Sequence, residues 1–104
     1  MDQNKGLPPS AVLFQIAGGL IQSRILWAIA HLRVGDTFDE SAAIEQIAAA
    51  TGTDAPLLGR VLDAACSFGV FARDDAGRYH HTDLSRALRS DHPTSMRDSI
   101  DGWP

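Results

Sequence analysis

The sequence has 104 residues, of which 44% are hydrophobic and 21% are charged, a composition typical of one globular domain. Its formal net charge of -4 argues against a general nucleic-acid binder and against long-range attraction to an anionic membrane. The single cysteine, Cys66, excludes an intrachain disulfide, and in its apolar helical stretch we expect a small buried hydrophobe. A lone thiol is typical of a reducing compartment, so we expect a cytoplasmic protein.

The first nine residues are polar and end in two prolines, and we expect a flexible lead-in without the features of a signal peptide. Ser10 is a candidate N-cap for a long helix that extends from Ala11 to about Arg33. Because polar residues interrupt this apolar stretch, we expect that it does not span a membrane. The folded domain is therefore expected to cover residues 10–104.

Residues of the first helix, placed at intervals of about 100° around its axis, form two apolar stripes on different sides. A surface helix normally has one apolar face, and a domain this small has one core. The second stripe therefore indicates contact with another subunit or a second domain. A glycine pair inside this helix indicates either a local kink or the close approach of a partner helix. The first stripe contains Val12, Ile16, Leu20, Trp27 and Ala30, and the second contains Phe14, Ala17, Ile21, Ile25, Ala28 and Leu32.

Two shorter helices are expected next. Gly35 is expected to end the first helix, since glycine readily adopts the left-handed conformation found there. Residues 41–50 have the apolar spacing of a second helix, which Gly52 closes. Asp54 is the expected N-cap of a third helix that continues to about Ser67.

The rest of the chain is predicted to contain a hairpin and short helices. Residues 70–73 and 78–81 are predicted strands, joined by the Asp-Asp-Ala-Gly turn at 74–77. Two helices followed by a two-stranded wing are typical of a winged helix-turn-helix. The fold class predicted is therefore mainly α, winged helix-turn-helix-like, with a long N-terminal helix and a short two-stranded hairpin. The short helices after the hairpin are expected to be capped by Thr82, and by Thr94 or Ser95.

Motifs for cofactor, metal or catalytic chemistry are not evident in the sequence. No G-x-G occurs, and the glycine pair of the first helix follows no strand, which argues against a Rossmann-type cofactor loop. His80 and His81 are neighbours on a strand and should point to opposite faces, so we expect exposed histidines rather than metal ligands. Asp74 and Asp75 are typical turn residues. We therefore expect no catalytic, cofactor-binding or metal-binding residue in this chain.

DNA binding is the main competing function for a winged helix. The helix that would enter the major groove carries Asp54, Arg60 and Asp63, an unfavourable balance for a surface that faces phosphates. The wing offers Arg73 and Arg78, but two aspartates between them offset their charge. We therefore expect no nucleic-acid partner, and a DNA-binding regulator remains an alternative.

Residues 44–91 have the sequence IEQIAAATGTDAPLLGRVLDAACSFGVFARDDAGRYHHTDLSRALRSD. This stretch resembles the N-terminal domain of plant-type and bacterial natural-product O-methyltransferases. The group includes polyketide and phenazine methyltransferases. The resemblance rests on four motifs whose order and spacing agree. One of them is a helix that starts at Asp54 and carries Leu58, Arg60, Val61 and Leu62. A helix ends in Ala-Thr-Gly at 50–52, Phe-Gly-Val-Phe follows at 68–71, and a strand ends in Tyr-x-x-Thr at 79–82. The similarity extends over about residues 11–104.

This resemblance implies a winged-helix dimerisation domain in which the first helices of two subunits intertwine. The homodimer it implies agrees with the second apolar stripe of the first helix. The interface residues expected on this basis are Val12, Phe14, Ile16, Ala17, Leu20, Ile21, Ile25 and Ala28.

The resemblance also implies a role beside an aromatic small-molecule substrate, whose pocket this domain lines in family members, often for the partner subunit. Their S-adenosylmethionine loop and general-base histidine lie in a separate, later Rossmann-like domain, and no residue here matches them. Large side chains of the first and last helices are the expected substrate contacts, namely Phe14, Trp27, Met96, Ile100 and Trp103.

Family members are considerably longer than this chain, so we expect either part of a methyltransferase or a stand-alone module. The first hypothesis is a dimerisation and pocket-lining module that is inactive alone, with S-adenosylmethionine bound elsewhere in the parent enzyme. The alternatives are a stand-alone small-molecule-binding or cyclisation protein on the same scaffold, and the DNA-binding regulator.

Overall fold

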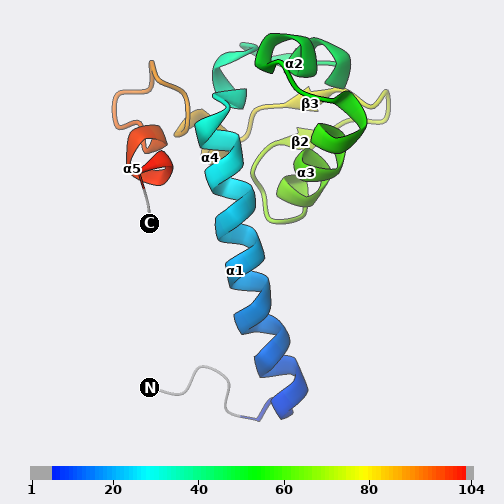
Figure 1. Ribbon diagram of the computed structural model, residues 1–104, viewed down its shortest axis with the longest axis vertical. Helices are drawn as coiled ribbons and strands as arrows, with labels where there is room; N and C mark the ends of the chain where they lie inside the picture. The colour runs from blue at the N-terminus through cyan, green and yellow to red at the C-terminus, as the bar shows by residue number, and fades with distance from the viewer. Residues whose placement is uncertain (1–5, 103–104) are drawn as a thin grey trace.

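Helix α1 (Pro9–His31) extends far beyond the rest of the fold in the computed structural model, which describes residues 6–102 (Figure 1). Pro8 is its N-cap, so the prediction of Ser10 was wrong. Proline suits the position that follows, because its fixed φ matches a helix and its missing N–H would be unpaired there anyway.

The break after α1 is made by Arg33, which adopts the left-handed conformation (φ 57°) predicted for Gly35. A short 3-10 helix, η1 (Val34–Asp36), follows directly. The carboxylate of Asp36 accepts hydrogen bonds from the backbone N–H of Ser90 at 2.8 Å and from its hydroxyl at 2.6 Å. These bonds hold the end of α1 against a segment that lies 54 residues later in the chain.

Helices α2 (Ile44–Thr51) and α3 (Ala55–Ser67) form the helix pair of the winged-helix arrangement. Gly52 closes α2 in the left-handed conformation (φ 68°), as predicted. Asp54 caps α3, also as predicted, because its carboxylate accepts a hydrogen bond from the backbone N–H of Leu57 at 3.0 Å. The sequence signals at these two helix ends are therefore confirmed.

The wing is a three-stranded antiparallel sheet rather than the predicted two-stranded hairpin. Strands β1 (Ser41–Ala42), β2 (Ala72–Arg73) and β3 (Tyr79–His80) lie in the order β1-β3-β2. Strand β1 replaces the first residues of the predicted helix 41–50. Two residues are too few for an alternating pattern to predict, and the pairing depends on the edge that β3 offers. The guanidinium of Arg78 supports the pairing by donating to the Ser41 hydroxyl at 3.3 Å.

Two short helices, α4 (Asp83–Arg86) and α5 (Arg97–Asp101), follow the sheet. Thr82 caps α4 as predicted, since its hydroxyl oxygen accepts a hydrogen bond from the backbone N–H of Ser85 at 3.3 Å. The N-cap of α5 is Met96, so the prediction of Thr94 or Ser95 was wrong. The Met96 N–H donates to the carbonyl of Ala87 at 2.8 Å, and this return of the chain to the end of α4 determines where α5 begins.

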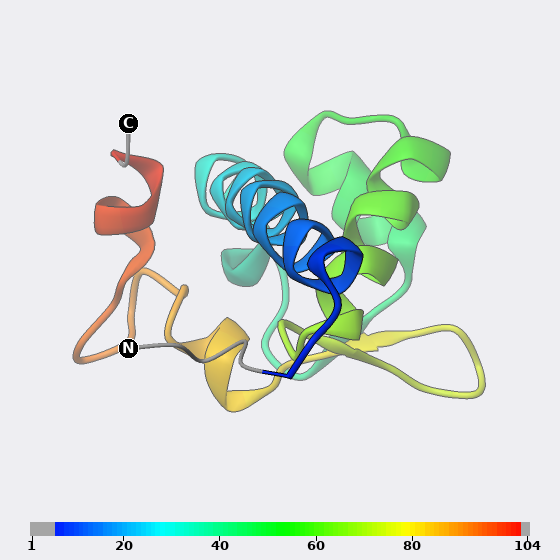
Figure 2. The same ribbon diagram turned by 90° about the horizontal axis from the view of Figure 1, so that it is seen from below.

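The hydrophobic core lies between the last turns of α1, the α2–α3 pair and the sheet. Seen from below, α1 lies beside the helix pair, and the strands run past them (Figure 2). Cys66 is half-buried against this core, and burial raises the pKa of its thiol. The largest buried side chains are Tyr79, Phe71, Ile29, Ile47, Leu62 and Val34.

The two wing histidines have different environments, which corrects the prediction that both are exposed. His80 pairs with Asp74 across the turn, with Nε2 2.7 Å from the carboxylate oxygen Oδ2. His81 is partly buried, and its ring stacks on Phe38 with 4.5 Å between the centroids. Its Nδ1 lies 2.9 Å from the Ser85 hydroxyl oxygen, and its Nε2 lies 3.0 Å from the carbonyl oxygen of Phe38. Burial lowers the pKa of His81, and the nearby arginines act in the same direction.

We predict that the domain loses stability as the pH falls through the ordinary histidine pKa of about 6.5. The pKa of His81 is lowered in the folded chain, so on acidification the unfolded chain binds a proton at a higher pH than the folded chain does. Below the ordinary histidine pKa, this proton binding stabilises the unfolded chain and lowers the free energy of unfolding. Urea unfolding at several pH values measures the effect. The His81→Gln variant should lack this part of the pH dependence, and the matched His80→Gln variant should retain it. An equal slope in both variants would contradict the assignment.

We also predict that Tyr79→Phe lowers the free energy of unfolding by about 1.5–3 kcal/mol, the contribution typical of a hydrogen bond to a charged group. The buried Tyr79 hydroxyl donates to Asp63 at 2.6 Å, and burial together with this bond raises the pKa of Tyr79 well above its usual range. Arg73 holds the same carboxylate at 3.1 Å. Denaturant unfolding measures the change, and a variant as stable as the parent chain would refute the prediction.

Candidate interaction surface and adjoining groove

The first two thirds of α1 are exposed on every side. No residue of this projecting segment (residues 9–24) is buried. Phe14 is 79% exposed and Leu20 is 64% exposed, whereas Ile29, nearer the end of the same helix, is 1% exposed. Apolar side chains therefore cover a helix surface that the chain itself leaves open to solvent. The other large exposed hydrophobic residues of the segment are Leu13, Ile16 and Ile21.

The prediction that α1 carries unpaired apolar surface is confirmed. The prediction that one stripe faces the core and the other faces a partner is wrong. In the projecting segment neither stripe contacts the domain core, while further along the helix Ile25, Ala30 and Leu32 of both stripes pack against it or are buried. The boundary therefore crosses the helix instead of running along it. A helix of 23 residues is about 35 Å long, and the body of this small domain supports only its last turns.

The composition of α1 also corrects the prediction that the helix is too polar to span a membrane. By length and mean hydropathy (1.4) it lies within the range of a membrane-crossing helix, and only 6% of that stretch is buried. Arg24 is its one Asp, Glu, Lys or Arg residue. An exposed apolar surface of this extent indicates a partner, whether a membrane or a protein.

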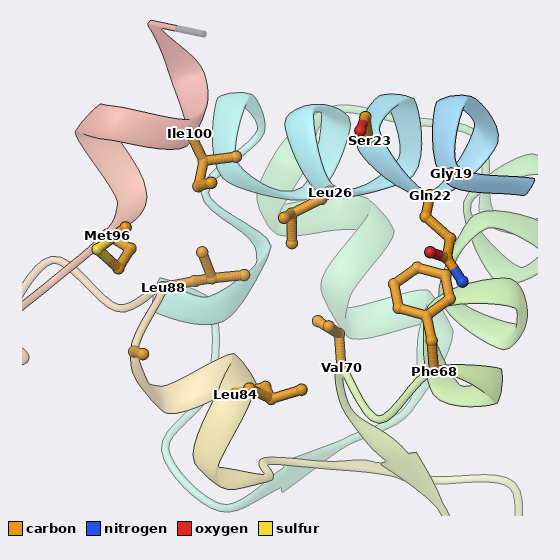
Figure 3. A pocket seen from close by; sticks show the side chains of 11 residues that line it. Gly19, Gln22, Ser23, Leu26, Phe68, Val70, Leu84, Leu88, Met96 and Ile100 are labelled. Carbon is orange, nitrogen blue, oxygen red and sulfur yellow. The ribbon is translucent and has the colours of Figure 1, made fainter. Parts of the chain in front are cut away.

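An apolar groove of about 420 Å³ adjoins the projecting segment (Figure 3). Helix α1 forms one wall, the turn after α3 and helix α4 form the floor, and α5 forms the far wall. Among the described residues, none of those that line the groove carries a charged side chain. The groove residues are Gly19, Gln22, Ser23 and Leu26 of α1, with Phe68, Val70, Leu84, Ala87, Leu88, Met96 and Ile100.

Gly69 shapes the floor of the groove. Its φ of 87° is one that side-chain-bearing residues rarely adopt, and a Cβ there would lie 3.5 Å from Leu84. This turn places Phe68 and Val70 in the groove, and the Thr82 hydroxyl fastens it by donating to the Gly69 carbonyl at 2.6 Å. Helix α3 ends at Ser67 as predicted, and the turn that follows also forms the floor of the groove.

Contacts from the last turns of α1 hold α5 in place. The indole N–H of Trp27 donates to the carbonyl oxygen of Asp101 at 3.1 Å. The Nδ1 of His31 lies 2.9 Å from the Asp101 carboxylate, and the Trp27 and His31 rings stack with 4.7 Å between centroids. Trp27 therefore positions the far wall and is not itself a groove residue.

The structure brings together two of the five expected substrate contacts. Met96 and Ile100 both line the groove, with Met96 half exposed at its edge. Phe14 lies on the projecting segment, outside the groove, and Trp103 lies outside the described residues. The sequence analysis missed Leu84 and Leu88, although their i, i+4 spacing is the signal that places them on one side of the chain.

The described residues do not suit S-adenosylmethionine. Its ammonium, carboxylate and sulfonium groups need charged or strongly polar partners, and the groove offers only the side chains of Gln22 and Ser23 as polar groups. Over residues 6–102, no cluster of three or more His, Cys, Asp or Glu side chains is placed to hold a metal ion.

Comparisons with known proteins agree with this geometry. Phenazine O-methyltransferase PhzM from Lysobacter antibioticus is 40% identical over 92 residues, which are 88% of this chain and 27% of the relative. The solved structure of LaPhzM has a TM-score of 0.84 at 38% identity, over 91% of this chain and 29% of that one. NcsB1, an O-methyltransferase from neocarzinostatin biosynthesis solved with S-adenosylmethionine and 2-hydroxy-5-methyl naphthoic acid, has a TM-score of 0.70 at 32% identity, over 76% and 25%.

The chain spans about a quarter of the length of these relatives, with 27% of PhzM and 25% of NcsB1 covered. Residues 14–91 match the O-methyltransferase dimerisation domain, a region that contains most of the projecting segment, the helix pair, the sheet and α4. The chain therefore belongs to the O-methyltransferase dimerisation domain family.

Proposed function

We propose that this chain is the dimerisation and pocket-lining part of a small-molecule O-methyltransferase, forms a homodimer, and is not catalytic by itself. The observation that carries the proposal is the projecting segment of α1, whose large apolar side chains the described chain leaves uncovered. Burying one large apolar side chain stabilises a contact by about 1.5–3 kcal/mol, so a second copy gains much by covering several of them.

The interface in this proposal is formed mainly by the projecting segment. Phe14, Ile16, Leu20 and Ile21 are each more than half exposed and require a partner. Ile25 packs against the core of its own domain and contributes at the edge of the contact. The remaining interface residues are Val12, Ala17 and Ala28.

The proposed substrate is an aromatic small molecule beside the edge formed by α5. The apolar lining of the groove, with Met96 and Ile100 on one wall, suits a flat apolar compound. The naphthoic acid with which NcsB1 was solved supports the same class. S-adenosylmethionine would be held by residues of the parent enzyme outside the described part, because the groove lacks groups for it.

Neither DNA binding nor membrane insertion is part of this proposal. Arg73 of the wing is engaged with Asp63 of α3, so this cation is less available to contact phosphates. The match to a dimerisation domain supports a protein partner for the apolar surface of α1. A cytoplasmic location is consistent with the single half-buried thiol.

We predict that Leu20→Asp raises the dimer dissociation constant by about 100-fold or more, because an unpaired carboxylate is costly in a dry contact. Sedimentation velocity over a range of concentrations measures it. The matched control is Leu57→Asp on α3, because Leu57 is 61% exposed against 64% for Leu20 and lies on a different element. A parent chain that stays monomeric at micromolar concentrations, or equal effects of the two variants, would refute the proposal.

A further inference from the structure

The groove has an apolar end and a polar end. Leu88 and Met96 lie at the end next to α5, whereas Phe68 and Gln22 lie at the opposite end (Figure 3). The side chain of Gln22 extends from α1 toward Phe68, while Ser23 stays close to the helix. The amide of Gln22 is therefore the polar group that the wall formed by α1 presents to the groove.

This amide is free to bind a ligand. Within residues 6–102, the side-chain hydrogen bonds that α1 makes to the rest of the chain come from Trp27 and His31, and the amide of Gln22 has no protein partner. An amide carries both a hydrogen-bond acceptor and a donor. A ligand that covers it must supply partners in place of water, because an unpaired buried amide is costly.

Gly19 leaves the wall open beside Gln22. It precedes Gln22 by three residues, so the two positions are neighbours on one helix face, and both line the groove. A Cβ built on Gly19 would meet no atom within 4 Å. Because no side chain fills this position, a substituent of a ring in the groove can approach the amide along the helix backbone.

The surroundings of Gln22 favour an uncharged substituent. Arg24, the one Lys or Arg of α1, lies about 160° around the helix from Gln22. Arg97, which follows Met96 at the other end of the groove, is buried and paired with Asp98. A carboxylate beside the amide would lose water without gaining a cation, whereas a phenol hydroxyl or a ring carbonyl matches the amide.

We infer that Gln22 is a specificity-determining residue that binds an uncharged hydroxyl or carbonyl group of the aromatic substrate, with the ring directed toward Leu88 and Met96. The inference rests on the proposed function and adds the charge and the orientation of the substrate. The naphthoic acid with which NcsB1 was solved supports the aromatic class, and the lining of this groove favours an uncharged member of that class.

The proposed dimer interface is compatible with this site. Leu20 and Ile21, the interface residues next to Gln22 in the chain, lie about 160° and 100° around the helix from it. A partner helix that contacts α1 through these two side chains therefore does not need the wall that carries the amide.

NMR titrations of the full chain with 2-naphthol and with 2-naphthoate test the inference. We expect 2-naphthol to bind more tightly than 2-naphthoate and to shift the methyl signals of Leu88 and Met96. Gln22→Leu should weaken the binding of 2-naphthol about 2–10-fold, the effect of one lost hydrogen bond, and leave that of 2-naphthoate unchanged. Gln15→Leu is the matched control, because Gln15 lies seven residues earlier on the same helix face and outside the groove.

Gln22→Lys provides a second measurement that a merely structural role would not change. Its ammonium group supplies the cation that the groove lacks, so the affinity for 2-naphthoate should rise about two- to fivefold, without a matching gain for 2-naphthol. An unchanged ratio of the two dissociation constants would contradict the inference.

The outcomes separate this inference from the proposed function. If Gln22→Leu binds 2-naphthol as tightly as Gln15→Leu does, or if the parent chain prefers 2-naphthoate, the inference is overturned and the groove remains an aromatic site. If the parent chain binds neither probe, the inference and the proposed role in lining a substrate pocket are both overturned.

Discussion

The structure depends on a difference in length: helix α1 is much longer than the part of the domain that packs against it. Ile29 and Ala30 fix the end of α1 in the core, whereas no residue of the projecting segment is buried by the described chain. Hydrogen bonds within a helix satisfy its backbone, but they do not remove apolar side chains from water. A long apolar helix on a small domain therefore favours association with a second chain.

In this winged-helix scaffold, charged groups of α3 and the wing are paired with one another. Asp63, on the helix that would enter the major groove, accepts hydrogen bonds from Tyr79 and Arg73 of the wing. The same contacts that fasten the wing to α3 therefore neutralise charge on both elements. The third strand extends this attachment, since β1 connects the chain before α2 to β3. The scaffold becomes a rigid support for α1 and for the floor of the groove.

The groove is assembled from segments that are distant in the chain, and each is held by a small number of polar contacts. Thr82 fastens the turn at Gly69, and Asp101 binds Trp27 and His31 across the gap between α5 and α1. These contacts lie at the edges, so the interior surface stays apolar. An apolar cavity with polar supports is suited to an aromatic ring and is unsuited to a charged cofactor.

Local signals in the sequence determined the helix pair, its caps at Asp54 and Gly52, and the unpaired apolar surface of the first helix, because each depends on residues close together in the chain. Tertiary structure decided how far along α1 the core extends, since periodicity reports the angle around a helix and not the length of the body beside it. It also decided the third strand and the burial of His81, which depend on pairing with β3 and stacking on Phe38. The groove also depends on tertiary structure, because its walls come together only when α5 packs against α1.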